Sequence, residues 1–342
     1  MFDWIRRRRS RAGPRDADAA LRAALLALLA RDHERAESLL VSSAELDSTR
    51  LEPHLALARF YRTRGDIGRA IRLHQSLLLR RDLDRDQRTL CLADLAADFR
   101  QGGFLQRAIA SYEEVLSRDP RHADALRALV KLYGDARDHT RAIELAKRLA
   151  RVEQRDAAAE IAGLWVDRAE AAHAEGNMRE ARRAIKRALS SDVRSVRAWI
   201  VLGQLEAERG RSKAALAAWS RVPTIDRKSG ALVYPHIESA YAALDRSRDF
   251  EGFLRALLEE RADDLHARLA LARALAARGE IEEALAELRR LLERDPEQLA
   301  ARAVLGRLLL SEHRDPEATK EYAELLDVLE RRGLLRTRER LG

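Results

Sequence analysis

The sequence predicts an all-α solenoid of about eight to nine helix pairs, and three observations predict it. Apolar residues recur at helical spacing in short stretches, glycines separate these stretches in pairs, and the pattern repeats along all 342 residues. The clearest unit is the stretch 51–77, LEPHLALARFYRTRGDIGRAIRLHQSL, in which Gly65 and Asp66 divide two amphipathic helices. Neither helix can bury its apolar face alone, so the unit requires neighbours of the same kind.

The repeat length is marked by a small residue in the second helix of each pair. This residue is Ala70 in the stretch 51–77, and we place its equivalents at Ala36, Ala108, Ala142, Ala181, Ala215, Gly252, Ala284 and Ala318. The separations are 34, 38, 34, 39, 34, 37, 32 and 34 residues, close to the 34-residue period of the tetratricopeptide repeat. The residue types agree independently, because W-x2-L-G at 199–203 and A-x3-W at 215–219 fit the pattern of that repeat. We therefore expect a tetratricopeptide-repeat superhelical solenoid.

The pairs follow one another along the chain in a single array. We expect residues 1–16 to be a basic, disordered leader, residues 17–330 to form the array, and residues 331–342 to be a basic tail. The first pair has Arg31 where a turn glycine is usual, and the fourth has Arg137. An insert at 80–87 separates the second and third pairs, and a linker at 151–157 precedes the fifth.

Prolines mark further boundaries. Pro53 and Pro235 are each expected to open a first helix, and Pro223 to end the second helix of the sixth pair early. A loop at 224–230 then follows. The seventh pair is the least regular, because Gly252 replaces the alanine and its turn lacks a glycine.

The charge of the chain invites a nucleic-acid interpretation, which we set aside. The formal net charge is +8 and the isoelectric point is near 9.9. Many arginines have an acidic neighbour three or four residues away, as Arg289 and Arg290 have in Glu293, which is typical of a solvated helix face. No aromatic stacking platform accompanies the charge. We expect no specific nucleic acid as a partner.

Catalytic and metal-binding patterns do not emerge. The nine histidines form no H-E-x-x-H pair, and no glycine-rich phosphate loop or nucleophile elbow occurs. Cys91 is the single cysteine, which excludes a cysteine-based zinc site within this chain; we expect it to be a buried small hydrophobe. We therefore expect a protein that is not an enzyme and has no cofactor or metal.

Solenoids of this class bind partners on the surface lined by the first helices. The positions expected to face it carry basic residues among small apolar ones, with Glu52, Asp124 and Glu170 as acidic exceptions. Such a surface favours an acidic or carboxylate-bearing peptide, since guanidinium groups bind carboxylates with two hydrogen bonds. The alternative is that these basic residues are only solvated. The candidate partner-binding residues are Arg59, Arg62, Arg100, Arg127, Lys131, Arg197, Arg273 and Arg307.

Part of the chain resembles the lipopolysaccharide assembly protein B family. The stretch 54–75, which ends in RAIRLHQ, goes beyond the generic repeat, and D-Q-R at 86–88 and the stretch 95–108 continue the likeness. The resemblance implies a cytoplasmic, non-enzymatic adaptor at the inner membrane. It would link a membrane AAA+ protease to the deacetylase of the lipid A pathway and so set lipopolysaccharide output.

The printed sequence departs from this family in two places. Family members open with a transmembrane anchor and close with a rubredoxin-like zinc ribbon, and neither is present here. A peripheral membrane contact through residues 1–11, which hold aromatic residues and an arginine cluster, is one alternative to a disordered leader. Two other functions stay open: a generic peptide-binding scaffold or co-chaperone, and an electrostatic binder of RNA or anionic membrane.

Overall fold

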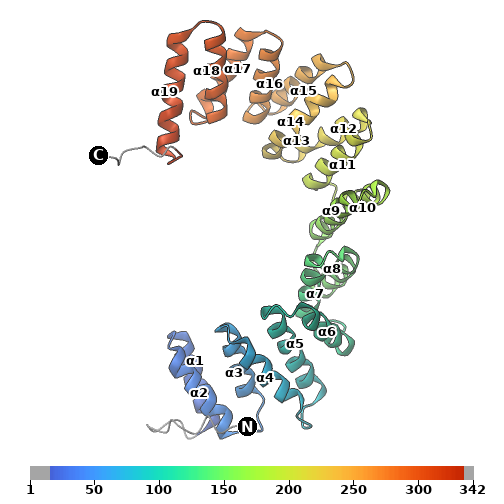
Figure 1. The fold of residues 1–342 in the computed structure, drawn as a ribbon, viewed down its shortest axis with the longest axis vertical. Coiled ribbons are helices and arrows are strands. Elements are labelled where there is room, and N and C mark those ends of the chain that lie inside the picture. The colour runs from blue at the N-terminus through green and yellow to red at the C-terminus, as the bar shows by residue number, and fades with distance from the viewer. Residues whose placement is uncertain (1–15, 335–342) are drawn as a thin grey trace, which may run out of the picture. The chain divides into compact units, whose positions relative to one another are not determined.

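The computed structural model describes residues 16–334 of the chain. These residues form nineteen α-helices and no strand (Figure 1). The helices belong to two compact units, one ending at Ala157 and the other beginning at Ala158. Each unit is a row of helix pairs in which a first helix, a tight turn and a second helix follow in the order that the sequence predicts.

The first unit holds four pairs of helices. Its helices are α1 (Ala17–Leu29), α2 (His33–Leu46), α3 (Glu52–Thr63), α4 (Ile67–Leu78), α5 (Arg85–Gln101), α6 (Leu105–Arg118), α7 (Ala123–Asp135) and α8 (His139–Glu153). Odd-numbered helices are the first helices of their pairs.

The second unit holds five pairs and one short extra helix. Its helices are α9 (Ala158–Ala174), α10 (Met178–Ser191), α11 (Val196–Glu208), α12 (Ser212–Trp219), α13 (Arg221–Ile225), α14 (Arg227–Ala242), α15 (Ser247–Glu260), α16 (Leu265–Ala277), α17 (Ile281–Arg294), α18 (Leu299–Ser311) and α19 (Asp315–Arg331). The five-residue α13 lies between α12 and α14, so the first helices of the last three pairs are α14, α16 and α18.

The turn inside each pair has one backbone conformation, whatever its sequence. In the second pair, Gly65 is left-handed, the Asp66 amide donates to the Tyr61 carbonyl at 2.9 Å, and the Asp66 side chain caps α4 by accepting from the Arg69 amide at 3.2 Å. All nine turns repeat the left-handed residue and the main-chain bond. The left-handed residues are Arg31, Gly65, Gly103, Arg137, Gly176, Gly210, Asp245, Gly279 and His313, with φ between 54° and 83°.

The second-helix alanines that define the repeat are fully buried. Ala36, Ala70, Ala108, Ala142, Ala181, Ala215, Ala284 and Ala318 are each 0% exposed, and each is the fourth residue of its helix. The equivalence proposed for Gly252 is wrong, because Gly252 is exposed and is the sixth residue of α15. The fourth residue of α15 is the buried Phe250. A search for small residues therefore misses this position. With Phe250 as the equivalent residue, the interval from Ala215 is 35 residues and the interval to Ala284 is 34 residues.

Two predictions that rest on prolines are also wrong: the loop expected after Pro223 and the helix expected to begin at Pro235. The expected loop at 224–230 is helical apart from Asp226, which ends α13 and caps α14 by accepting from the Ser229 amide at 3.0 Å. Because that cap starts α14 at Arg227, Pro235 falls inside the helix rather than at its beginning. Pro235 is exposed there, so its ring projects from the solvent side of α14. Pro223 lies in the first turn of α13, where a missing N–H costs no helical hydrogen bond.

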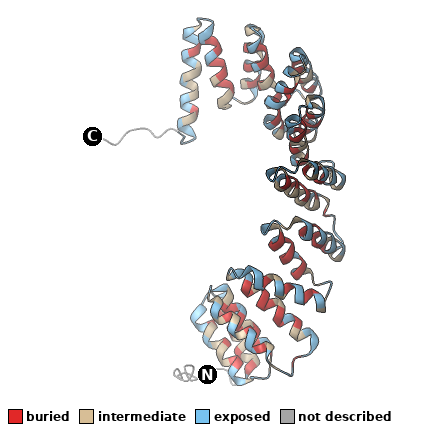
Figure 2. Ribbon diagram, turned by 45° about the vertical axis from the view of Figure 1, so that its right-hand side comes forward, coloured by how far each residue is buried: buried red, intermediate tan, exposed pale blue. Residues whose placement is uncertain are grey.

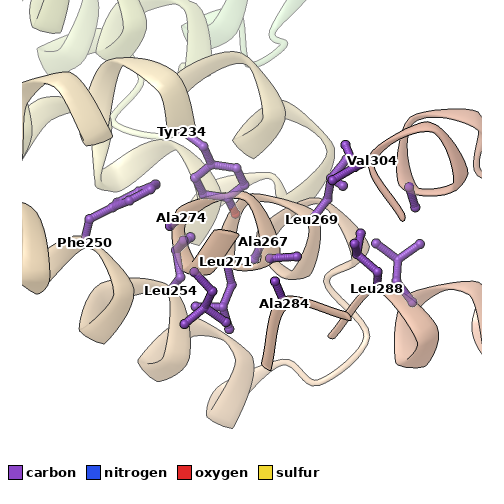
Figure 3. Packing of buried hydrophobic residues seen from close by; sticks show 14 of the residues in the cluster. Tyr234, Phe250, Leu254, Ala267, Leu269, Leu271, Ala274, Ala284, Leu288 and Val304 are labelled. Atoms are coloured by element: carbon purple, nitrogen blue, oxygen red, sulfur yellow. The ribbon is translucent and has the colours of Figure 1, made fainter. Parts of the chain in front are cut away.

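Buried residues lie on the faces where neighbouring helices meet, and the outer faces are exposed (Figure 2). In the second unit a continuous cluster of buried hydrophobic residues extends from Ala215 to Ala318. Figure 3 shows part of it, with Tyr234, Phe250 and Leu271 contributed by α14, α15 and α16. The first unit has clusters of its own.

Large and small residues compensate one another where the helices of a pair cross. A Cβ added at Gly203 would lie 2.2 Å from the Trp219 indole nitrogen, and one added at Gly306 would lie 2.9 Å from the Tyr322 ring. Both glycines lie seven residues before the left-handed turn residue, and both aromatic residues lie nine after it. At these two crossings the aromatic side chain leaves room only for glycine opposite it, whereas in the third pair the same positions hold Tyr112 and Ala96.

Candidate protein-binding surface

The left-handed turn residue gives every pair a common origin for counting. The residue six positions before it lies on the first helix and is exposed or half-buried in all nine pairs. We call this set the first-helix row: Leu25, Arg59, Ala97 and Lys131 in the first unit, and Glu170, Gln204, Ser239, Arg273 and Arg307 in the second. Four of the eight candidate residues belong to it. The other four occupy different positions, Arg62 and Arg100 three residues before the turn residue, and Arg127 and Arg197 nearer the start of their helices.

Two of the candidates, Arg59 and Arg62, are held by the neighbouring repeat. Arg59 on α3 donates from Nε and Nη2 to the Asp94 carboxylate of α5 at 2.9 and 2.7 Å. Arg62 donates to both Asp94 and Asp98 on α5, at 3.0 and 2.9 Å. Asp94 and Asp98 are buried, and the Arg62 side chain is only 16% exposed. These contacts fix α3 against α5 across one repeat interval.

Asp98 also contacts a histidine from a third helix. The His74 Nδ1 on α4 lies 2.5 Å from the second carboxylate oxygen of Asp98, and both side chains are 0% exposed. The other ring nitrogen of His74 has no hydrogen-bond partner among the described residues. His74 therefore occupies a packing position, as its place in the repeat predicts. Arg62, Asp94, Asp98 and His74 join α3, α4 and α5 into one polar network.

The charges and hydrogen bonds of this network favour the ionised form of the Asp94 carboxyl. Burial by itself raises the pKa of the Asp94 carboxyl, but the hydrogen bonds and charge of Arg59, together with the hydrogen bond from Arg62, outweigh burial and hold that pKa below its ordinary value. Nearby, burial and the Asp94 charge raise the pKa of Cys91 to about 11. Cys91 is 0% exposed, so the expectation of a buried small hydrophobe is confirmed.

Arg127 and Arg197 also have acidic partners, although both are exposed. Arg127 on α7 donates to Asp124 at 2.5 Å and to Glu153 at the end of α8. Arg197 on α11 donates to Asp167 at 2.6 Å and to Glu170, both on α9. Their guanidinium groups are thus shared between the chain's own carboxylates and solvent.

The remaining four candidates are exposed and unneutralised. Within residues 16–334, these side chains make neither an ion pair nor a hydrogen bond: Arg100, Lys131, Arg273 and Arg307. Lys131, Arg273 and Arg307 all lie in the first-helix row. A partner's carboxylate can reach these groups without displacing a carboxylate of the chain itself.

Sequence reasoning singled out the basic candidate residues but missed the acidic residues that form ion pairs with half of them. Asp94 and Asp98 lie four residues apart on an otherwise apolar helix face, and Asp94 follows Arg59 by 35 residues, about one repeat interval. That spacing was a usable signal. A test of each arginine for an acid one repeat interval later identifies Arg59 as paired, whereas the residue 34 positions after Arg273 is Arg307 and the next is Leu308.

The main surface depressions lie elsewhere. One of about 410 Å³ is lined by Arg85, Asp86, Thr89, Leu90, Arg118, Asp119 and His122, and one of about 500 Å³ by Thr224, Ile225, Asp226, Arg227, Glu260, Arg261 and Asp263. Both mix basic and acidic side chains, and neither contains a candidate residue. In the described part of the chain, no three His, Cys, Asp or Glu side chains gather in a way that fits a metal ion.

Comparison with protein families agrees with the fold. Profiles of the tetratricopeptide repeat match residues 93–161, 166–229 and 251–308. Together with the helix pairs, the buried alanines and the common turn, these matches define the class: the chain is a tetratricopeptide-repeat protein.

The curated relatives narrow this class. The chain is 27% identical over 257 residues to lipopolysaccharide assembly protein B of Escherichia coli, a match that covers 75% of the chain and 66% of that protein. It is also 27% identical over 212 residues to lipopolysaccharide assembly protein B of Haemophilus influenzae, over 61% of the chain and 53% of that protein. The resemblance found in the stretch 54–108 is thereby confirmed and extended. The chain spans just under two thirds of the length of the first relative and about half of the second.

Among solved structures, the crystal structure of MamA covers 49% of this chain and 97% of its own, at 20% identity and a TM-score of 0.36. A likeness of that size concerns the repeat alone. As for membranes, every helix within residues 16–334 is too short or too polar to cross a bilayer.

Proposed function

We propose that this protein is a non-enzymatic adaptor that regulates lipopolysaccharide assembly at the cytoplasmic face of the inner membrane. In this proposal it links the deacetylase of the lipid A pathway to a membrane AAA+ protease. The observation that carries the proposal is the 27% identity to lipopolysaccharide assembly protein B over 257 residues. The repeat array supports the coarser part, a protein-binding scaffold, because the helix pairs of each unit present a row of exposed or half-buried first-helix positions.

The eight candidate residues divide into two roles under this proposal. Arg100, Lys131, Arg273 and Arg307 contact the partner, because their charges are exposed and make no ion pair within residues 16–334. Arg59, Arg62, Arg127 and Arg197 position the helices through their ion pairs. A charge reversal at Arg59 would bring a carboxylate against Asp94 and disturb the fold, so it cannot report on binding.

The experiment is affinity capture from a bacterial membrane extract. The bait is either the intact chain or a variant that combines Lys131→Glu and Arg273→Glu, and Arg289→Glu serves as the control. Arg289 is exposed on the second helix α17, outside the first-helix row. We expect mass spectrometry to identify the protease or the deacetylase with the intact chain and the control, and to find it depleted with the double variant.

Other outcomes assign the protein differently. Capture of unrelated proteins, without protease or deacetylase, would point to a generic scaffold or co-chaperone. Capture that falls steeply between low and physiological salt, and that needs RNA or anionic lipid, would point to the electrostatic binder instead. The ion pairs around Arg59, Arg127 and Arg197 favour the adaptor over that binder, because guanidinium groups already bound to the chain's own carboxylates are less available to phosphates.

A further inference from the structure

Arg273 and Arg307 are equivalent residues of successive repeats. They lie 34 residues apart, each six positions before the left-handed residue of its turn, on the first helices α16 and α18. These two helices are in direct contact within the second unit (Figure 1). Both side chains are exposed. The repeat geometry therefore presents two guanidinium groups on the same face of adjacent helices.

Within residues 16–334 neither arginine makes an ion pair, and no acid lies one turn away from either along its own helix. One turn away along α16 are Leu269 and Ala277, and one turn away along α18 are Ala303 and Ser311. Several acids on the neighbouring second helices α17 and α19 have partners of their own. Their ion pairs are Glu287 with Arg268 and Arg290, Glu317 with Arg289 and Arg314, and Glu321 with Arg302.

This arrangement differs from the other basic positions of the second unit. Arg197 is neutralised by two carboxylates of α9, and one of them, Glu170, is the first member of the first-helix row in this unit. Two adjacent guanidinium groups without an acid repel one another and keep their hydration, so they add nothing to the fold by themselves. Alanines at 270, 277, 300 and 303 lie within two turns of the two arginines along α16 and α18, and each is exposed or half-buried. Their small side chains allow a chain segment to approach these helices closely.

We propose that Arg273 and Arg307 bind two carboxylates of an acidic peptide segment lying across α16 and α18. The inference rests on the proposed function, since it names the ligand chemistry of the same first-helix surface. Helices in contact are about 8–10 Å apart, and an extended peptide advances about 3.3 Å per residue. The two acidic residues are therefore three apart in an extended segment, with small or apolar residues between them.

The test begins with selection from a phage-displayed library of random 12-residue peptides. The full chain is compared with the double variant Arg273→Gln and Arg307→Gln, and with the control Arg289→Gln. Circular dichroism establishes that all three fold alike, which we expect because every substituted side chain is exposed. We expect the intact chain and the control to enrich peptides with two Asp or Glu residues three apart, and the double variant not to enrich them.

Fluorescence polarisation then measures the dissociation constant of an enriched peptide and of its Glu→Gln counterpart. We expect the double variant to bind the acidic peptide at least about tenfold more weakly, and the neutral peptide to bind equally weakly to both proteins. Enrichment of acidic peptides to the same extent on the double variant would overturn the inference and leave the scaffold function intact. If the intact chain enriches no peptide at all, the proposed peptide-binding surface fails as well.

Discussion

At the scale of single residues, the polar network of α3, α4 and α5 has a stability that depends on pH. The pKa of Asp94 is lower in the folded chain than its unfolded value of about 3.9. Its charged form is therefore stabilised by folding. This contribution is present above the unfolded pKa and is lost as the pH falls through the folded pKa.

The substitution Asp94→Asn tests this pH-dependent contribution of Asp94 to stability. At pH 7 it removes the charged acceptor of Arg59 and Arg62, and we expect the free energy of unfolding to fall by about 1–3 kcal/mol. At pH 3 the difference from the unsubstituted chain should shrink, because the carboxyl is then mostly protonated in the unfolded chain and folding no longer gains the full stabilisation of its charged form. Urea unfolding at pH 7 and at pH 3, followed by circular dichroism, measures the difference in the free energy of unfolding at each pH.

Asp124→Asn is the matched control, because Asp124 pairs with Arg127 on the surface and its side chain is 81% exposed. An exposed pair of this kind contributes less than about 1 kcal/mol. An equal loss for the two substitutions at pH 7 would contradict the role assigned to the buried network.

At the scale of elements, the turns show how far local sequence determines local structure. Five of the nine left-handed residues are glycines, which the sequence predicts, whereas Arg31, Arg137, Asp245 and His313 adopt the same conformation without being glycine. The main-chain bond of the turn and the buried alanine or Phe250 that follows are common to all four. Only the turns at Arg31 and Arg137 also have a side-chain cap, from Asp32 and Asp138. The sequence therefore located nine pairs from the regular turns and the repeat period.

Arg137→Gly should stabilise the chain. A left-handed conformation costs a non-glycine residue about 1 kcal/mol or more, and part of that cost is recovered when glycine replaces arginine at φ 60°. We expect the free energy of unfolding to rise by about 0.5–1 kcal/mol. The reverse substitution, Gly103→Ala, should lower it by a similar amount, since no atom lies within 4 Å of the added Cβ and only the backbone conformation resists. Chemical denaturation measures the free energy of unfolding of both variants. A higher value for Gly103→Ala than for the unsubstituted chain would refute the idea that the left-handed conformation favours glycine here.

The crossing of α11 and α12 gives a second prediction at this scale. Gly203→Ala places a methyl group against the Trp219 indole, and we expect a loss of about 1–3 kcal/mol together with a shift in tryptophan fluorescence. Gly163→Ala in α9 is the control. It meets no atom within 4 Å, so alanine's higher helix propensity should leave the chain equally stable or slightly more stable. Similar losses for both variants would exclude a specific clash with Trp219.

Sequence reasoning failed where packing, rather than pattern, decides. Gly252 was selected as a small residue, but in α15 the large Phe250 occupies the equivalent buried position. The cap at Asp226 places Pro235 inside α14. Among the candidate arginines, the difference between paired Arg59 and unpaired Arg273 depends on side chains one repeat away, which a search of local windows does not include.

At the scale of the whole molecule, the two units have separate hydrophobic clusters. Stability in repeat arrays is approximately the sum of repeat and nearest-neighbour contributions. We therefore expect urea unfolding of the whole chain to be broader than a single two-state transition.

A protein made from residue 158 onwards should retain the helical circular dichroism expected for the second unit and unfold in a single cooperative transition. Its midpoint should coincide with one part of the broader transition of the whole chain. Loss of helix in this shorter protein would show that its core depends on the first four pairs.

The ion pairs between repeats also bear on how such a chain changes during evolution. Arg59 reaches Asp94, Arg69 reaches Glu37, Arg255 reaches Glu283 and Arg314 reaches Glu282, each in an adjacent pair of helices. Loss or duplication of one pair would bring together charges that do not match, even though the alanines and turns would still fit. The pairs share a backbone plan but are not interchangeable, so their order along the chain is itself part of what selection has to preserve.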